Sequence, residues 1–264
     1  MQTSEQRYSQ AILPREARPI RLGTWLFTMV EPRPGHAIAY NRWYERDHFY
    51  SGCMIGADTL AGGRYVATRD CKAKRFGWGD RDLAKGSYLA LYWILDGRHQ
   101  EWDAWAVAQG NALHREGRRF LERDHIHTGF YSYEAEYNTP GSITPIELAL
   151  DRAYAGVAAM IIDLAPGKTK ADVASVLSGL DCPGDVALIG APVPLDPSRP
   201  KDVPASEGRH VVLVNFSPED PLAVWEARYV PLAEKIEASG VGRIGFASPF
   251  LATVVGTDTY TDQL

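Results

Sequence analysis

The segment from 125 to 137 carries the densest set of chemically useful side chains in this sequence. Its residues alternate in type as in a β-strand, where side chains two apart share a face. Ile126, Thr128 and Phe130 suit a face covered by helices. The other face carries imidazoles and phenols, at His125, His127, Tyr131 and Tyr133. Because buried polar groups need partners, we expect this face to line a cavity; the alternative is an edge facing solvent.

A second group of reactive side chains lies between residues 36 and 49. No Gly or Pro interrupts this stretch after Gly35, and its apolar residues recur at helical intervals. Tyr40, Tyr44 and His48 stand four residues apart and therefore share one helix face, with Asp47 beside them. Such a row can bring phenols, an imidazole and a carboxylate to a cavity mouth. The alternative is a helix end, where His48 meets free carbonyls and the tyrosines only pack.

Two further strands supply candidate binding residues. Arg64 lies in a predicted strand at 63–68 and can hold a carboxylate through two parallel hydrogen bonds. In the next strand, at 88–95, Tyr88 and Tyr92 share a face, which we expect to line the same cavity. His125, Tyr131, Tyr40 and Asp47 complete the predicted substrate-binding set.

Neither a metal nor a cofactor is expected. His125 and His127 alone could start a metal site, but no Asp, Glu or Cys cluster lies nearby to complete it, unless the fold brings in His48 or Asp47. The sequence has no P-loop, GxGxxG, GxSxG or HExxH motif. Catalysis, if present, is therefore expected from side chains alone.

The elements that position these residues follow the order β-α-β-β-α-β, and the order occurs twice. The first copy has strands at 21–30, 63–68, 88–95 and 125–137, with helices at 36–49 and 100–122. The second has strands at 157–164, 186–193, 210–216 and 241–255, with helices at 169–177 and 219–239. This pattern predicts an α+β protein of two ferredoxin-like units.

The predicted organisation is a polar arm (1–20), a first ferredoxin-like domain with the active site (21–137), a linker (138–153) and a second domain (154–264). The arm is a candidate clasp for a partner subunit, so a homodimer is expected. The 264 residues are 45% hydrophobic, which excludes bulk disorder. The formal charge of -5 argues against nucleic acid as a partner.

The three cysteines are widely spaced and odd in number, so neither a disulfide framework nor a CxxC site is expected. No stretch has the roughly 20 apolar residues of a membrane span, and the first 20 residues lack the apolar core of a signal peptide. These features predict a cytoplasmic protein with no membrane partner.

The element order, together with Asn41-Arg42-Trp43-Tyr44 and His48 on the first helix, resembles the dimeric α/β-barrel superfamily, and within it the EthD-like proteins. The resemblance covers about residues 21–255 in topology, whereas its motif is matched only in the first half. Tyr50 stands where the family tends to have a proline. The resemblance implies two antiparallel sheets that together enclose a barrel, with the helices outside.

The leading hypothesis is a cofactor-independent lyase that decarboxylates a small, phenolic or otherwise aromatic acid. His127 is the candidate acid or base, because an imidazole titrates near neutrality. Tyr44 and His48 would hold or deprotonate the phenol, and Arg64 would grip the carboxylate.

Other outcomes remain open on the same barrel, because fold does not decide function. The resemblance implies cyclisation of polyketides, isomerisation and cofactor-free oxygenation. A non-catalytic barrel that carries a ligand such as haem through His48 or His127 is a different class of alternative, and a purely structural role is a third.

Overall fold

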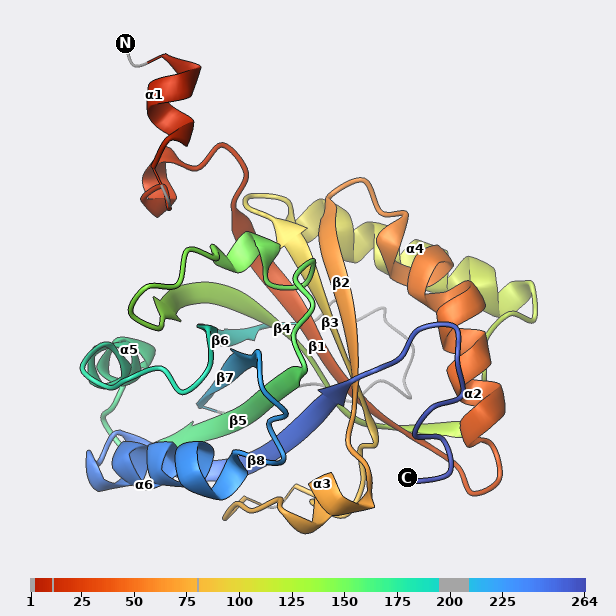
Figure 1. Ribbon diagram of the computed structural model, residues 1–264. Coiled ribbons are helices and arrows are strands. Elements are labelled where there is room, and N and C mark those ends of the chain that lie inside the picture. The colour runs from red at the N-terminus through yellow and green to blue at the C-terminus, as the bar shows by residue number, and fades with distance from the viewer. Residues whose placement is uncertain (1–2, 11, 80, 195–208) are drawn as a thin grey trace.

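Eight antiparallel strands close into a single barrel in the order β1-β3-β2-β8-β5-β7-β6-β4 (Figure 1). The computed structural model describes residues 3–10, 12–79, 81–194 and 209–264. The strands are β1 (Leu22–Pro32), β2 (Thr59–Val66), β3 (Tyr88–Leu95), β4 (Arg123–Asn138), β5 (Gly156–Leu164), β6 (Val186–Val193), β7 (His210–Ser217) and β8 (Gly242–Ala252).

Each half of the chain contributes four consecutive strands to this ring. In both halves the fourth strand lies beside the first, followed by the third and then the second, which is the ferredoxin-like order. Two seams join the halves, β4 with β6 and β2 with β8. The predicted fold class, two β-α-β-β-α-β units in an antiparallel α/β barrel, is confirmed.

The helices lie outside the barrel (Figure 1). Those of the first half are α2 (Ala37–Trp43), the π-helical turns η2 (Tyr44–His48) and η3 (Tyr50–Met54), the short α3 (Arg69–Ala73) and α4 (His99–Arg115). Those of the second are α5 (Lys170–Ser178), the π-helical turn η5 (Trp225–Tyr229) and α6 (Val230–Ala238). Among the described residues, no helix has the length and apolar character needed to cross a bilayer.

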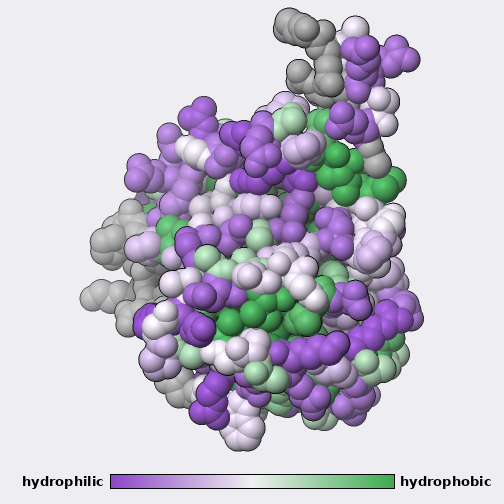
Figure 2. Space-filling model, turned by 90° about the vertical axis from the view of Figure 1, so that its left-hand side faces the viewer, coloured by the Kyte–Doolittle hydropathy of each residue, from purple (hydrophilic) through white to green (hydrophobic). Residues whose placement is uncertain are grey.

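The N-terminal arm carries α1 (Ser4–Tyr8) and the 3₁₀ turn η1 (Arg15–Ala17), and it projects from the barrel (Figure 1). Its root is fixed by Arg18, which is 9% exposed and donates to Glu147 at 2.9 Å and to Glu136. Glu147 lies in the 3₁₀ turn η4 (Ile146–Leu148), within the predicted linker. Figure 2 shows a mostly hydrophilic face with hydrophobic side chains at the base of the arm and a second group near its middle. Ile20 and Leu148 are exposed and line a pocket together with Ile12 and Leu13 of the arm.

Large side chains fill the middle of the barrel. Alternate residues of the strands form one apolar cluster there, which includes Trp25, Phe27, Leu91, Trp93, Tyr131, Ile161, Leu188, Val214, Phe216 and Phe246. The intervening residues pack against the helices in two outer clusters, one for each half. The cavity that we expect at the barrel centre is therefore filled, because side chains of the described residues, many of them aromatic, occupy that space.

Two of the predicted side-chain orientations are also wrong. On β3 the residues that face the interior are Leu89, Leu91 and Trp93, whereas Tyr88 and Tyr92 face the helices. On β4 the pairing with β1 shifts between Met29 and Val30, which leaves an extra residue at 126. Such a β-bulge reverses the alternation of faces. His127 and Tyr131 consequently face the interior, while His125 lies on the helix-covered side.

Candidate functional site

A cavity of about 190 Å³ lies between the helices of the first half and the outer face of its sheet. We call it the helix–sheet cavity. Its apolar lining includes Leu26, Trp102, Val107, Leu113 and Phe130. Its polar lining includes Tyr44, His48, Cys53, Tyr92, Asp103, Arg118, Arg119, Arg123, His125 and Thr128. An apolar pocket in which a few polar groups converge is the usual form of a small-molecule site.

The wall that carries Tyr44 and His48 is not a regular α-helix. The Phe49 amide donates to the Tyr44 carbonyl, and the Ile55 amide donates to the Tyr50 carbonyl at 3.1 Å, so each bond spans five residues. A π turn widens the helix and changes the direction of the side chains that follow it, and such turns occur often at functional sites. Here the two turns present Tyr44, His48, Gly52 and Cys53 to the cavity.

The His48 imidazole is held between two aromatic rings and a glycine. It stacks on Trp43, with ring centroids 4.5 Å apart, and meets Tyr44 edge-on at 5.1 Å. A Cβ atom at Gly52 would lie 2.6 Å from the imidazole, so only glycine leaves room for this position. Burial and, to a smaller extent, the positive charge of Arg123 lower the His48 pKa to about 3. The imidazole is therefore neutral at neutral pH.

Two phenols meet beside this imidazole. The hydroxyl groups of Tyr44 and Tyr92 lie 2.8 Å apart and share a hydrogen bond. Burial raises the pKa of both phenols well above the usual range, and it raises the pKa of the neighbouring Cys53 thiol to about 12. All three groups are therefore protonated and act as hydrogen-bond donors or acceptors without carrying charge.

Arginines supply most of the charge around the cavity. Arg118 donates through Nε to Asp47 at 3.1 Å, and this hydrogen bond lowers the pKa of that carboxyl. Arg123 lies 4.9 Å over the Trp43 ring and donates to His125 Nε2 at 3.3 Å. Arg119 lines the cavity as well. A low-dielectric pocket with cations in its wall attracts an anion or a group that becomes one.

The structure brings four of the nine predicted site residues into this one cavity: Tyr44, His48, Tyr92 and His125. Asp47 lies next to it, paired with Arg118. Tyr40 and Arg64 lie behind Tyr44. The Tyr40 ring packs 5.7 Å from the Tyr44 ring, and the Arg64 guanidinium lies 4.5 Å from the centre of the Tyr44 ring.

His127 and Tyr131, the remaining two, lie inside the barrel. His127 Nε2 is 2.7 Å from the Tyr131 hydroxyl, which is also 3.0 Å from His210 Nε2. Burial, followed by the charges of His210 and Arg81, lowers the His127 pKa to about 3. The His127 ring packs edge-on against Phe27 at 5.6 Å. The sheet separates this network from His48, so the predicted catalytic trio of His127, Tyr44 and His48 is not assembled.

Sequence reasoning missed the arginines and Cys53 as cavity residues. A signal for the arginines exists, because Arg118, Arg119 and Arg123 cluster just after a predicted helix in an acidic chain. Nothing in the spacing indicates Cys53, because its position follows from the π turn. Among the described residues, no group of three or more His, Cys, Asp or Glu side chains is placed to hold a metal ion.

No protein-family model and no curated protein matches this chain. Solved structures do match it. An anthrone oxidase-like protein is 10% identical with a TM-score of 0.53, covering 91% of this chain and 98% of its own. A candidate chlorite dismutase is 10% identical with a TM-score of 0.51, and the match covers 92% of this chain and 100% of the other. A candidate monooxygenase from Fusobacterium nucleatum is 9% identical with a TM-score of 0.49, and the match covers 88% of this chain and 94% of the other.

The chain has the ferredoxin-like α/β-barrel fold. At such low identity the likeness shows the fold and nothing finer, so membership among the EthD-like proteins remains a prediction. The expected cofactor-independent decarboxylase is contradicted. The anthrone oxidase-like protein and the candidate chlorite dismutase bear oxidase and dismutase names rather than lyase names. In addition, the predicted proton donor His127 and the carboxylate clamp Arg64 lie outside the cavity that holds His48.

Proposed function

We propose that this chain is a cofactor-free monooxygenase that oxidises a small phenolic or enolisable aromatic compound in the helix–sheet cavity. One observation carries the proposal: a single apolar cavity holds a neutral imidazole, a hydrogen-bonded pair of phenols and three arginines. The first supports proton removal, the second orients an oxygen atom, and the third stabilises the negative charge that proton removal creates.

The chemistry begins with proton transfer. His48, neutral at rest, accepts the proton of the substrate hydroxyl, and Arg119 and Arg123 stabilise the resulting phenolate. The phenolate also raises the pKa of the adjacent His48 imidazole, because its negative charge stabilises the imidazolium. Proton transfer from the substrate to His48 is thereby favoured. Tyr44 and Tyr92 donate and accept hydrogen bonds that fix the substrate oxygen.

The phenolate then supplies the electrons for oxygen. It passes one electron to O₂, and the two radicals combine in a carbon–oxygen bond to give a hydroperoxide. Loss of water leaves a quinone: one oxygen atom stays on the ring, and the other departs with two hydrogens taken from the substrate. Electrons and atoms balance with O₂ as the only co-reactant.

Haem, the alternative ligand for such a barrel, does not fit the described residues. The cavity of about 190 Å³ is smaller than the roughly 300–1,000 Å³ typical of sites for drug-sized ligands, and a porphyrin is at least that large. The candidate ligand His48 packs its Nδ1 against Gly52, where even a Cβ atom would stand 2.6 Å away. The other candidate ligand, His127, has its Nε2 bonded to Tyr131 in a filled interior.

The test is oxygen uptake by purified, metal-free protein with anthrone or a naphthol as the probe. We expect a quinone product that contains one labelled atom when labelled O₂ is supplied. The His48→Phe variant should lose about 10²-fold or more of the rate, the usual contribution of a placed acid or base. His114→Phe, a change at an exposed residue of α4, is the matched control.

His127→Phe tests the remaining prediction for His127, because a loss equal to that of His48→Phe would place the chemistry in the barrel interior. Absence of oxygen uptake with every enolisable aromatic probe would overturn the proposed function.

The narrower expectations about partners belong to this proposal. We propose that the substrate is aromatic and becomes anionic when bound, which the arginines of the cavity support. A homodimer and a cytoplasmic location remain predictions, to be tested by sedimentation of the purified protein and by cell fractionation.

A further inference from the structure

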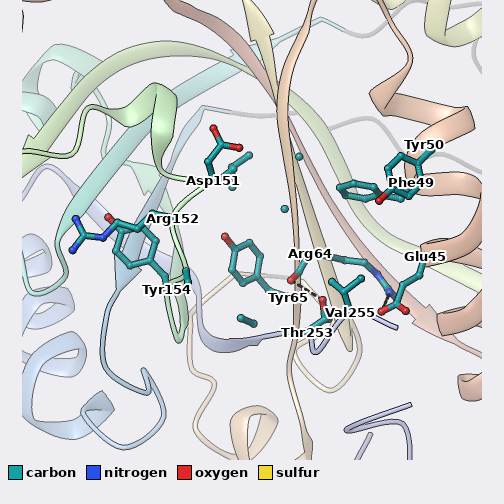
Figure 3. A pocket seen from close by; sticks show the side chains of 15 residues that line it. Glu45, Phe49, Tyr50, Arg64, Tyr65, Asp151, Arg152, Tyr154, Thr253 and Val255 are labelled. Carbon is teal, nitrogen blue, oxygen red and sulfur yellow. Dashed lines mark hydrogen bonds and ion pairs between the residues drawn. The ribbon is translucent and has the colours of Figure 1, made fainter. Parts of the chain in front are cut away.

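The two seams that join the halves are very unequal. Strands β4 and β6 pair at eight positions, from Phe130 to Asn138 of β4, whereas β2 and β8 pair only at Tyr65 and Val66. Beyond Tyr65 the barrel wall opens into a cavity of about 390 Å³, here called the seam cavity. Its walls are η2 and η3, β2, the segment 150–154 and the chain after β8 (Figure 3).

The Tyr65 phenol is directed into this cavity. Figure 3 shows its ring between β2 and Tyr154 with the hydroxyl pointing into the open space. The residue is only 6% exposed, and its hydroxyl, which opens into the cavity, makes no hydrogen bond within the described part of the chain. Gly63 lies next to it, and the hydroxyl is 3.2 Å from the place where a Cβ of that residue would stand. A hydroxyl that opens into a cavity without a protein partner is free to donate a hydrogen bond to a ligand.

The cation beside Tyr65 also has unused donors. The Arg64 side chain is 4% exposed, and its Nη1 donates to Asn41 at 2.8 Å and Glu45 at 3.4 Å. Its Nε and Nη2 have no acceptor among the described residues, but the rings of Tyr44 and Tyr88 enclose the guanidinium, and these two atoms have almost no accessible surface. The second oxygen of Glu45 already accepts from the Gly256 amide at 2.9 Å. Arg64 therefore contributes a positive charge behind the cavity wall, and Tyr65 is the side chain that can donate directly to a ligand.

The rest of the cavity is apolar and open at its mouth. Phe49 and Leu150 line it, and Val255 and Tyr50 leave 73% and 55% of their surfaces exposed at the rim. Arg152 is engaged with Asp185 at 3.0 Å. The exposed Asp151 carboxylate lies at the outer edge, where water screens its charge.

We propose that the seam cavity is a second binding site, for a small organic acid. The carboxylate accepts a hydrogen bond from Tyr65 and is attracted by the charge of Arg64, while an apolar body fills the mouth between Phe49, Leu150 and Val255. The volume falls in the range of known small-molecule sites. This site is separate from the helix–sheet cavity and does not depend on the oxygenase proposal.

The test is a titration of the full chain with benzoate and with benzamide, followed by calorimetry and ligand-observed NMR. We expect benzoate to bind and benzamide to bind at least tenfold more weakly. Tyr65→Phe removes one hydroxyl without changing the shape of the side chain. Loss of a hydrogen bond to a charged group should weaken benzoate binding roughly ten- to hundredfold.

Two variants, each with a larger side chain in one of the two cavities, show which cavity binds benzoate. Ala153→Phe narrows the mouth of the seam cavity and should abolish the benzoate binding that Tyr65→Phe weakens. Gly110→Leu fills the helix–sheet cavity, where a Cβ meets nothing within 4 Å, and should leave benzoate binding intact. Unchanged melting temperatures show that each variant is folded.

The proposal is overturned by any of three results: no benzoate binding at millimolar concentration, equal binding of benzamide, or binding that disappears in Gly110→Leu but persists in Tyr65→Phe.

Discussion

Burial sets the protonation state of two imidazoles in this molecule, on opposite faces of the same sheet. His48 packs among aromatic rings in the helix–sheet cavity, and His127 shares a hydrogen bond with Tyr131 in the barrel interior. Burial lowers both pKa values from 6.5 to about 3. In an unfolded chain both side chains would take up a proton near their ordinary pKa.

This difference predicts a loss of stability in acid. Between about pH 6.5 and pH 3 the unfolded state binds more protons than the native state, so the free energy of unfolding falls as the pH falls. Each imidazole should contribute a slope of about 1 kcal/mol per pH unit. Urea unfolding at several pH values measures the slope, and His48→Gln or His127→Gln should each reduce it. The exposed control His114→Gln should not, and a slope unaffected by either buried variant would contradict the assignment.

At the level of secondary-structure elements, the sequence predicts the strands closely and their side-chain directions less well. Strands β3 and β6 occupy the expected residues, 88–95 and 186–193. The alternation on β4 fails at one bulge, because an extra residue in a strand leaves no mark in the pattern of residue types. For that reason His125 and His127, two residues apart, face different compartments.

The first helix shows a similar limit. Spacing of four residues correctly placed Tyr44 and His48 on one cavity wall. It could not show that the helix continues to Met54 through two π turns, because five-residue hydrogen bonds depend on packing rather than on local preference. Cys53 and Gly52 enter the cavity only through these turns.

Gly52 offers a test of this local geometry. In Gly52→Ala the new Cβ would stand 2.6 Å from the imidazole, so the His48 ring must leave its position over Trp43. We expect the His48 pKa, measured by NMR titration, to rise from about 3 toward its ordinary value, and the rate of oxygen uptake to fall at least about tenfold. Gly179→Ala, at the end of α5, is the matched control, because its new Cβ would meet only the Val176 carbonyl oxygen at 3.5 Å. An unmoved His48 resonance would contradict this account.

At the level of the whole molecule, the unequal seams predict unequal protection of the backbone. Strand β6 is paired on both edges, with β4 and β7, whereas β2 is paired along β3 and touches β8 at two residues. Hydrogen exchange should therefore be faster in peptides covering Thr59–Arg64 than in peptides covering Val186–Gly190. Slower exchange in β2 would show that something else closes the seam.

The two halves also exchange segments. The connection after α3 lies along β8, where Phe76 forms a bridge with Ala247 and the Trp78 amide donates to Ile244 at 2.8 Å. In return, the chain after β8 crosses back to the first half, where Asn41 donates to Thr257 at 2.9 Å. The tail continues to Arg69, which donates to Leu264.

Because each half makes hydrogen bonds with a segment of the other, the chain is suited to fragment complementation. Cleaved at the exposed turn after Gly141, it would yield polypeptides 1–141 and 142–264, each holding a strip of the other. Co-expressed with a purification tag on one piece, the two should be recovered together in equal amounts and melt as one unit. Elution of the tagged fragment alone would show that the predicted domain limits are misplaced. Elution of both fragments together would make the pair usable as a split reporter, in which a signal depends on association of the two fragments.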